Sequence, residues 1–111
     1  MAPSTKLRRT ADFRRIVQTG RRVSGKRVTM YWVPSSEQTR AGVVARREVG
    51  GAVLRNRARR VLREAWRQVS PAVERPVEVV LVARPGAAEA KTPEVAEEIR
   101  GLMVRKGLVS G

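Results

Sequence analysis

The segment with the clearest chemical potential is residues 54–67, LRNRARRVLREAWR, in which six of the fourteen residues are arginine. A guanidinium group stays charged at physiological pH, and its planar fork binds phosphate oxygens in a bidentate manner. Glu64 is the only acidic residue in the segment, so like charges recur four residues apart, which destabilises an isolated helix. A solvated helix face normally mixes both signs of charge. This pattern therefore favours a surface that binds a polyanion.

The residue types needed for protein-centred catalysis are scarce. The chain contains no histidine, no cysteine and a single aspartate, Asp12. Thiolate catalysis and the usual zinc sites need cysteine or histidine, and histidine is the commonest general base. Hydrolysis of a phosphodiester by the protein itself would need such a base or a carboxylate cluster around a metal. The composition predicts a binding protein whose own side chains do not carry out the chemistry.

The net charge of +14 is concentrated in one part of the chain. Residues 1–67 hold 18 basic and four acidic residues, whereas residues 68–111 hold six of each. This asymmetry predicts a defined surface for a polyanion, with nucleic acid as the first candidate and an anionic membrane as the second. The absence of a signal peptide, of an apolar run of transmembrane length and of disulfides leads us to expect a cytoplasmic protein that does not bind membranes.

Three helices are predicted, and the first covers 10–22. There, Phe13, Ile16 and Val17 share one face, and Gly20 suits a left-handed residue at the helix end. The last helix begins near Thr92.

The arginine-rich segment forms the second predicted helix, over about 53–69, with arginines on one side and Trp66 at the boundary. Its opposite side is predicted to be apolar and consists of Leu54, Ala58, Val61, Leu62, Ala65 and Val69. Because the core needs that apolar side, membrane binding by this helix is disfavoured. A DNA-binding helix-turn-helix is disfavoured too, because strands are predicted before the helix.

The predicted strands lie on both sides of the basic helix. Residues 26–34 and 40–47 are expected to form an antiparallel hairpin, with a weaker strand around 22–24. Residues 77–86 are apolar enough for a strand buried on both faces. The order predicts an α+β fold, a small two-layer sandwich in which three helices pack on a mixed sheet of about four strands.

The motif VGGAVLRNRARRVLREA, residues 49–65, resembles the signature of the protein subunit of bacterial ribonuclease P. That signature contains Val-Gly-x-Ala-Val, then Arg-Asn-Arg, then further basic residues and Arg-Glu. The segment LRRTADFRRIVQTGRR resembles the start of the family's sequence, and VVLVARPGAA resembles its last strand and turn. The resemblance extends from about Leu7 to Lys106. We therefore expect a single domain over 1–111 with an ordered core of about 7–106 and flexible ends.

The resemblance implies a fold akin to a ribosomal-protein domain, with a left-handed βαβ crossover. It also implies an accessory role in a ribonucleoprotein that cuts precursor tRNA endonucleolytically, releases the 5′ leader and leaves the mature 5′ end. The catalyst would be the RNA subunit with Mg²⁺. The protein would help to bind the leader and would support metal binding, and it would need no further protein partner.

The resemblance also assigns residues to two RNA surfaces. The basic helix would contact the catalytic RNA through Arg55, Asn56, Arg57, Arg59, Arg60 and Arg63. A cleft between the first helix and the sheet would bind the leader through Phe13, Val17, Tyr31, Arg46 and Arg47. Core packing is an equally good explanation for Phe13.

Some positions depart from the family pattern, and the metal positions stay unassigned. Val17 stands where many members have a second aromatic residue, and Arg46 stands where a serine is usual. Glu48 replaces a basic residue, and it is expected to pair with a neighbouring arginine or to help bind a metal ion.

A structural RNA-binding protein of the ribosome, or of a similar particle, is the alternative interpretation. The same charge and the same fold would serve it. It predicts association with ribosomal subunits and no effect on tRNA maturation.

Overall fold

The structure is a computed structural model, and it describes residues 5–110. The strands and α-helices are β1 (Thr5–Lys6), α1 (Thr10–Thr19), β2 (Arg21–Ser24), β3 (Val28–Pro34), β4 (Arg40–Ala45), α2 (Ala52–Val69), β5 (Val77–Ala83) and α3 (Thr92–Arg105). Three single-turn 3₁₀ helices lie between them: η1 (Arg47–Val49), η2 (Ser70–Ala72) and η3 (Ala87–Glu89). The expected flexibility of the ends falls partly on residues 1–4 and 111, which lie outside the described residues.

The strands form one mixed sheet in the order β1-β4-β5-β3-β2. β5 pairs parallel with β4 and antiparallel with β3, and all seven of its residues are buried. The α+β class, the presence of three helices and the central buried strand are confirmed, but the first helix ends at Thr19, and residues 21–22 belong to β2 and not to the helix. The sheet gains one strand beyond those predicted, because Thr5 and Lys6 pair with the first two residues of β4.

The predicted hairpin of residues 26–34 and 40–47 is wrong, because β5 lies between β3 and β4. The loop between β3 and β4 crosses the start of β5. The Ser35 amide donates to the Pro76 carbonyl at 3.0 Å, and the Val77 amide donates to Thr39 Oγ1 at 3.3 Å. A strand buried on both faces needs a neighbour on each side, so β5 takes the centre. The hairpin that does form joins β2 and β3.

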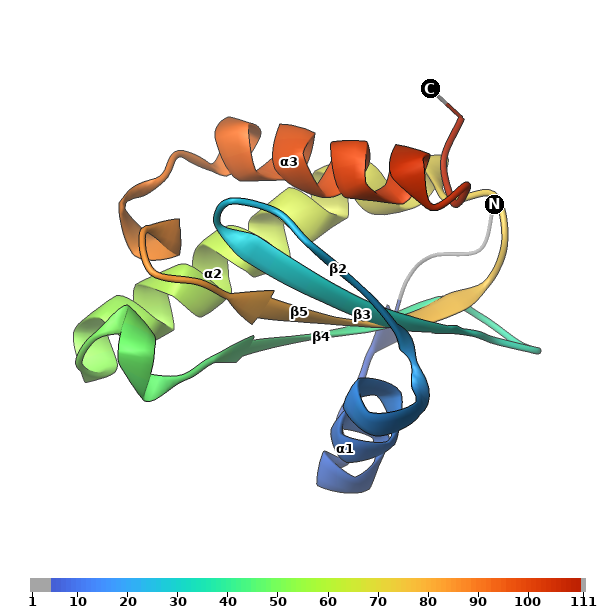
Figure 1. The fold of residues 1–111 in the computed structure, drawn as a ribbon, viewed down its shortest axis with the longest axis horizontal. Coiled ribbons are helices and arrows are strands. Elements are labelled where there is room, and N and C mark those ends of the chain that lie inside the picture. Colours follow the sequence, from blue (N-terminus) through green and yellow to red (C-terminus); the bar gives the residue numbers. More distant parts are fainter. Residues whose placement is uncertain (1–4, 111) are drawn as a thin grey trace.

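Helices cover both faces of the sheet (Figure 1). α2 and α3 pack together on one face over the larger core cluster, in which Met30 and Leu81 are fully buried. α1 lies on the other face over a smaller cluster that includes Ile16 and Val80. The expected two-layer sandwich therefore has a third, partial layer. The side chains of β3 alternate between the two clusters, as the period of a strand requires.

The basic helix is placed by its apolar side. α2 links β4 to β5 and so forms the crossover of a βαβ unit. The predicted apolar residues face the core: Ala58, Val61, Leu62, Ala65 and Val69 are buried, and Leu54 packs against the cluster. Trp66, which was expected at the boundary, is only 5% exposed. The arginines are therefore held on one side of a rigid helix.

Gly20 ends α1 but not in the expected left-handed conformation, since its φ is −79°. A β-carbon there would lie 2.4 Å from the Ile16 carbonyl oxygen and 2.8 Å from that of Trp32. Close approach of α1 to β3, and not backbone conformation, therefore explains the glycine.

Packing continues past residue 106 at the carboxyl end. Leu108 and Val109 are buried in the larger cluster. The Glu74 amide donates to the Leu108 carbonyl at 3.0 Å, and the Ser110 amide donates to Glu74 Oε2 at 3.1 Å. This segment closes the end of the core between α2 and α3.

Candidate nucleic-acid interface

The outer side of α2 carries the side chains assigned to the catalytic RNA, and we call this surface the arginine face. Three of its members are exposed and three are half-buried, and the whole set is Arg55, Asn56, Arg57, Arg59, Arg60 and Arg63. None of its arginines forms an ion pair with a carboxylate of residues 5–110. The side chain of Arg59 donates a hydrogen bond to Asn56 Oδ1. Glu64, the only acidic residue of the helix, instead accepts a hydrogen bond at 3.4 Å from Thr92 Oγ1 of α3.

The start of α2 adds to the positive potential of the arginine face. The first turn contains no acidic residue, and the cap position is Gly51, which supplies no side-chain hydrogen bond. The amino-terminal end of a helix carries a partial positive charge, so Arg55, at the end of the first turn, lies where a cation is disfavoured. An anion that binds here neutralises both the arginines and the helix end.

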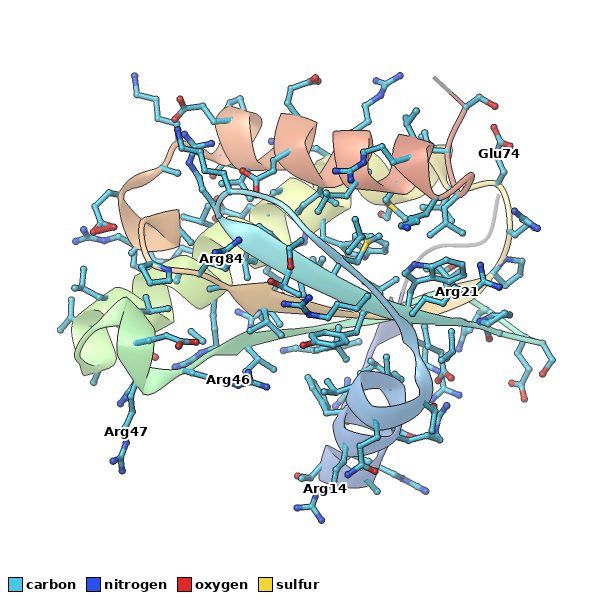
Figure 2. All side chains as sticks on the ribbon, in the orientation of Figure 1. Arg14, Arg21, Arg46, Arg47, Glu74 and Arg84 are labelled. Carbon is cyan, nitrogen blue, oxygen red and sulfur yellow. The ribbon has the colours of Figure 1, made fainter. Side chains whose placement is uncertain are left out.

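A groove between α1 and the sheet lies on the opposite face, and we call it the α1 groove. Its volume is about 280 Å³, and its lining consists of Thr10, Phe13, Arg14, Val17, Gln18, Val44, Arg46 and Val82. Phe13, Val17 and Arg46, which were assigned to leader binding, therefore lie together. Arg14 projects from α1, and Arg46 follows the end of β4 (Figure 2). Apolar walls with arginines beside them suit a single-stranded nucleic acid whose bases are unstacked.

Phe13 serves both core packing and the groove. It packs against the smaller core cluster and is half-buried. A β-carbon on Gly42 of β4 would lie 2.3 Å from Phe13 Cζ, so the ring rests directly on the strand backbone. The glycine gives the ring room to sit low in the groove, with part of its surface open.

Two of the residues assigned to leader binding lie outside the α1 groove. Tyr31 packs with the same cluster, but Arg22 covers it: Arg22 Cζ is 6.0 Å from the ring centroid, and Arg22 Nε donates to the Tyr31 hydroxyl at 3.3 Å. Arg47 is exposed at the start of η1 and points away from the sheet (Figure 2). A base that stacks on Tyr31 would first have to displace Arg22.

A smaller cavity of about 90 Å³ joins the two surfaces, and the sequence did not predict it. Its lining includes Phe13 from the α1 groove and Arg63 from the arginine face, together with Trp66 and Lys6. The cavity lies beside β4 where β1 has ended, so the strand edge is uncovered there. The only feature of the sequence that pointed to this cavity was the position of Trp66 at the boundary between the apolar and basic sides of the helix. Arg14, Gln18 and Lys6 had no signal in the sequence.

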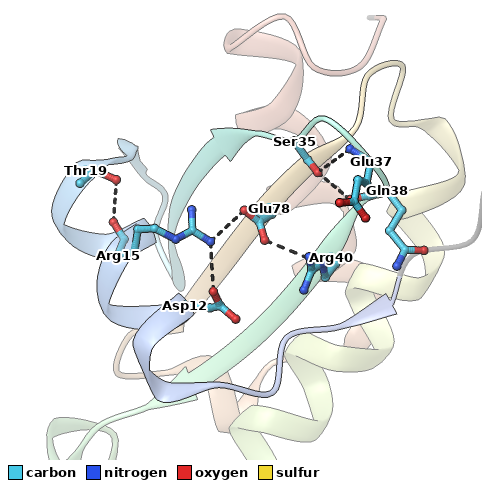
Figure 3. Close-up of polar contacts among 8 residues, drawn as sticks. All are labelled: Asp12, Arg15, Thr19, Ser35, Glu37, Gln38, Arg40 and Glu78. Carbon is cyan, nitrogen blue, oxygen red and sulfur yellow. Dashed lines mark hydrogen bonds and ion pairs between the residues drawn. The ribbon is translucent and has the colours of Figure 1, made fainter.

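Arg15 of α1 and Arg40 of β4 have carboxylate partners, in contrast to the arginines of α2 (Figure 3). Arg15 binds Glu78 at 3.0 Å and Asp12 at 3.2 Å, and Arg40 Nε lies 3.8 Å from Glu78. The hydrogen bond to Glu78, followed by the one to Asp12, raises the pKa of Arg15. Glu78 is only 8% exposed, so this carboxylate fixes two arginines from within the sheet.

Comparison with known protein families shows which family this chain belongs to. The model of the family described as Ribonuclease P matches residues 1–107. This chain belongs to the ribonuclease P protein family. Two relatives named ribonuclease P protein component support the assignment. The one from Acidothermus cellulolyticus is 42% identical over 95% of this chain and 91% of its own length. The one from Caldanaerobacter subterraneus is 34% identical over 94% and 90%.

Solved ribonuclease P proteins have the same fold. The Staphylococcus aureus protein matches with a TM-score of 0.79 at 22% identity, over 95% of this chain and 97% of its own. The Thermotoga maritima protein matches with a TM-score of 0.77 at 24% identity, over 90% and 96%. Membership of the ribonuclease P family makes the chain part of an endoribonuclease holoenzyme, with a role in tRNA 5′-end processing together with an RNA subunit.

Neither a metal cluster nor a membrane span is found in the part of this ribonuclease P protein that the structure describes. Within residues 5–110, no three acidic, histidine or cysteine side chains form a group that could hold a metal ion. No helix in that range is long and apolar enough to cross a bilayer. Glu48 is exposed on η1, and the expected ion pair with a neighbouring arginine is not present among the described residues.

Proposed function

We propose that this chain is the protein subunit of a ribonuclease P ribonucleoprotein and that its arginine face binds the catalytic RNA. The observation that carries this proposal is a row of arginines without carboxylate partners in the described chain, on a helix whose other side is buried. RNA phosphates would supply the missing negative charge, and each contact would release condensed counterions. The residues that would make these contacts are Arg55, Asn56, Arg57, Arg59, Arg60 and Arg63.

The proposal places the 5′ leader of precursor tRNA in the α1 groove. Phe13 offers a ring face for a base, Val17 adds apolar surface, and Arg46 lies where a phosphate can reach it. Tyr31 and Arg47 lie outside the groove, so they would contact the leader only beyond it, and Tyr31 only after Arg22 is displaced. Since stacking tolerates every base, this arrangement favours binding with little sequence preference.

The chemistry would belong to the RNA subunit and its Mg²⁺ ions, which hydrolyse the phosphodiester between the leader and the mature tRNA. The protein's part is to bind and orient: the arginine face holds the catalytic RNA, and the α1 groove holds the strand that is removed. We infer that the whole chain, 1–111, acts as one domain in the cytoplasm and needs no further protein. No residue of this chain is assigned a catalytic role.

The test is cleavage of a 5′-extended precursor tRNA by the cognate catalytic RNA at low Mg²⁺, with and without the protein. We expect strong stimulation that grows with leader length and is smallest for a leader of one nucleotide. Equal cleavage rates with and without the protein would contradict the proposal. If the protein then co-sedimented with ribosomal subunits, the structural RNA-binding alternative would replace it.

A further inference from the structure

A second hollow lies at the opposite end of β4 from Arg46, and we call it the amino-terminal pocket. It measures about 480 Å³ and is lined by Lys6, Arg8, Arg9, Asp12, Gln38 and Arg40. Four of these six side chains are cationic, and no residue assigned to RNA so far is among them. The positive charge of the pocket comes from two segments, β1 with the turn after it and the start of β4, while the start of α1 adds Asp12.

Most of this positive charge is available to a ligand. Lys6, Arg8 and Arg9 are exposed, and none of them forms an ion pair with a carboxylate in the described part of the chain. The carboxylate on the lining, Asp12, already binds Arg15 at 3.2 Å. Arg40 lies 3.8 Å from Glu78, which also holds Arg15 at 3.0 Å. An anion in the pocket would therefore meet three uncompensated cations and a fourth that is partly compensated.

The pocket is continuous with the surfaces already described. Lys6 lines both the amino-terminal pocket and the 90 Å³ cavity, and Phe13 lines both that cavity and the α1 groove. The three hollows thus follow β4 from Arg40 to Arg46. Six strand residues span about 20 Å, which is several nucleotide steps of an extended strand. One RNA strand can therefore occupy the groove and reach the pocket.

The order along β4 indicates which part of such a strand reaches the pocket. The Arg46 end of β4 continues through η1 into the first turns of α2, where the catalytic RNA is proposed to bind. Leader nucleotides next to the cleavage site must lie near that RNA. The end of β4 that carries Arg40 is therefore farther from the first turns of α2, whereas Lys6 shares the 90 Å³ cavity with Arg63 of the later part of that helix.

We propose that the amino-terminal pocket is a second phosphate-binding site, which holds the backbone of leader nucleotides farther from the cleavage site than those in the α1 groove. This inference rests on the proposed function. Exposed guanidinium and ammonium groups with no ring beside them for stacking favour contacts with phosphate oxygens, which carry no sequence information. The site would therefore add affinity for long leaders of any sequence. The affinity that the phosphate contacts add would fall more steeply with salt than the affinity that stacking in the groove adds.

The test uses the reconstituted holoenzyme and precursor tRNAs whose leaders lengthen by one nucleotide at a time. The variant is Arg8→Ala with Arg9→Ala, since both side chains are exposed and make no hydrogen bond to another described residue. We expect unchanged affinity for short leaders and a loss of about three- to tenfold for leaders long enough to reach the pocket. For long leaders, the slope of log affinity against log salt concentration should become shallower by about 0.7 for each phosphate that the variant no longer neutralises.

Matched variants separate the site from general charge. Arg100→Ala with Arg105→Ala removes two exposed arginines of α3 and the same net charge, and it should leave the leader-length profile unchanged. Arg8→Lys with Arg9→Lys keeps the charge and should keep most of the long-leader affinity. Circular dichroism and Tm of each variant establish that it folds.

Three outcomes would overturn the inference. If the Arg8/Arg9 variant lost no more affinity for long leaders than the α3 variant does, the pocket would be only a solvated basic surface. A loss that is the same at every leader length, with weaker binding to the catalytic RNA alone, would assign the pocket to the RNA subunit. A loss already complete at the shortest leader would place these arginines beside the α1 groove. Failure of the wild-type protein to stimulate cleavage would instead reject the proposed function.

Discussion

The two faces of the molecule differ in how their arginines are paired with carboxylates. On α2, the arginine face keeps its cations apart from carboxylates, and its one acidic neighbour, Glu64, is turned toward α3. On the α1 side, Asp12 and Glu78 hold Arg15, and Glu78 also approaches Arg40. The first face is a dense array of charge on a rigid helix, whereas the second combines fixed charge with apolar hollows. Under the proposed function, the first face would bind a structured RNA through its phosphates, and the second would bind a single strand through stacking in the α1 groove and through phosphate contacts in the amino-terminal pocket.

The two modes of binding predict different salt responses. Phosphate neutralisation makes affinity fall steeply with salt, because each neutralised phosphate releases counterions. Stacking of a base on Phe13 depends on contact with the ring and is much less sensitive to salt. Removing charge from α2 should therefore reduce the slope of log affinity against log salt concentration. Removing the ring should lower the affinity by the same factor at every salt concentration and leave that slope unchanged.

The largest expected effect comes from Arg55→Ala combined with Arg59→Ala. The variant removes two charge-assisted hydrogen-bonding groups for phosphate, so the Kd for the catalytic RNA should rise by about 10- to 100-fold. The log–log salt slope should fall by about 1 to 2. Filter binding at several salt concentrations would measure both quantities. The fold should survive, because both side chains lie on the side of α2 away from the core. Disappearance of the helical circular-dichroism spectrum would show instead that these arginines are structural.

Phe13→Leu should have the next largest effect, and it acts on the other face. Leucine keeps apolar contact with Gly42 and the smaller core cluster but offers no ring for a base. Stacking contributes about 1–3 kcal/mol per base, so affinity for precursor tRNA with a leader should fall about tenfold. Binding of a leaderless tRNA should not change, and this serves as the internal control. An equal loss for both substrates would make Phe13 a packing residue alone.

The sequence predicted the arginine face well because helical periodicity is a local property. Spacing of apolar residues every three or four positions placed Ala58, Leu62 and Ala65 inward, and the arginines could then only face outward. The central strand was equally readable, because a run of seven buried residues has few other possible locations. Both predictions depended only on short segments of chain.

The α1 groove was less predictable, because it is built from segments distant in sequence. Phe13 and Arg46 were assigned to it through family resemblance, whereas Arg14 and Gln18 line it because of how α1 packs on the sheet. The wrong hairpin has the same origin, since periodicity does not reveal that β5 inserts between β3 and β4. Tyr31 was assigned to the groove by its place on a strand, and its cover by Arg22 depends on the register of β2 with β3.

Glu78→Gln should make the two faces more alike, with a smaller effect. The amide has the same shape but no charge, so Arg15 and Arg40 lose the carboxylate that holds them. The Arg15 side chain is 45% exposed, which screens the ion pair, and we expect the free energy of unfolding to fall by about 1 kcal/mol. Urea denaturation would measure it. Binding of a leader oligonucleotide should become tighter and steeper in salt, since Arg40 loses its carboxylate neighbour and Arg15 keeps only Asp12. Unchanged salt dependence would mean that Glu78 does not restrain charge on this face.

The smallest expected effect concerns the support behind the arginine face. The Lys91 amide donates to Glu94 Oε1 at 3.0 Å, and this hydrogen bond lowers the pKa of Glu94 below its ordinary 4.5. A lowered pKa in the folded state stabilises the fold above the ordinary pKa, and that stabilisation disappears as the pH falls through the folded value. Glu94→Gln should therefore lower Tm slightly at pH 7, and the difference from wild type should close as the pH falls below 4.5.

Glu97→Gln, on the exposed side of the same helix, is the control for loss of one negative charge. Differential scanning calorimetry from pH 3 to pH 7 would compare the three proteins. The start of α3 also holds Glu64 of α2 through Thr92 Oγ1. If Glu94→Gln weakened catalytic-RNA binding while Glu97→Gln did not, the rigidity of the arginine face would depend on this capped end of α3. If both bound the RNA as wild type does, the larger core alone would hold α2 in place, and the contrast between the two faces would rest on their surface side chains.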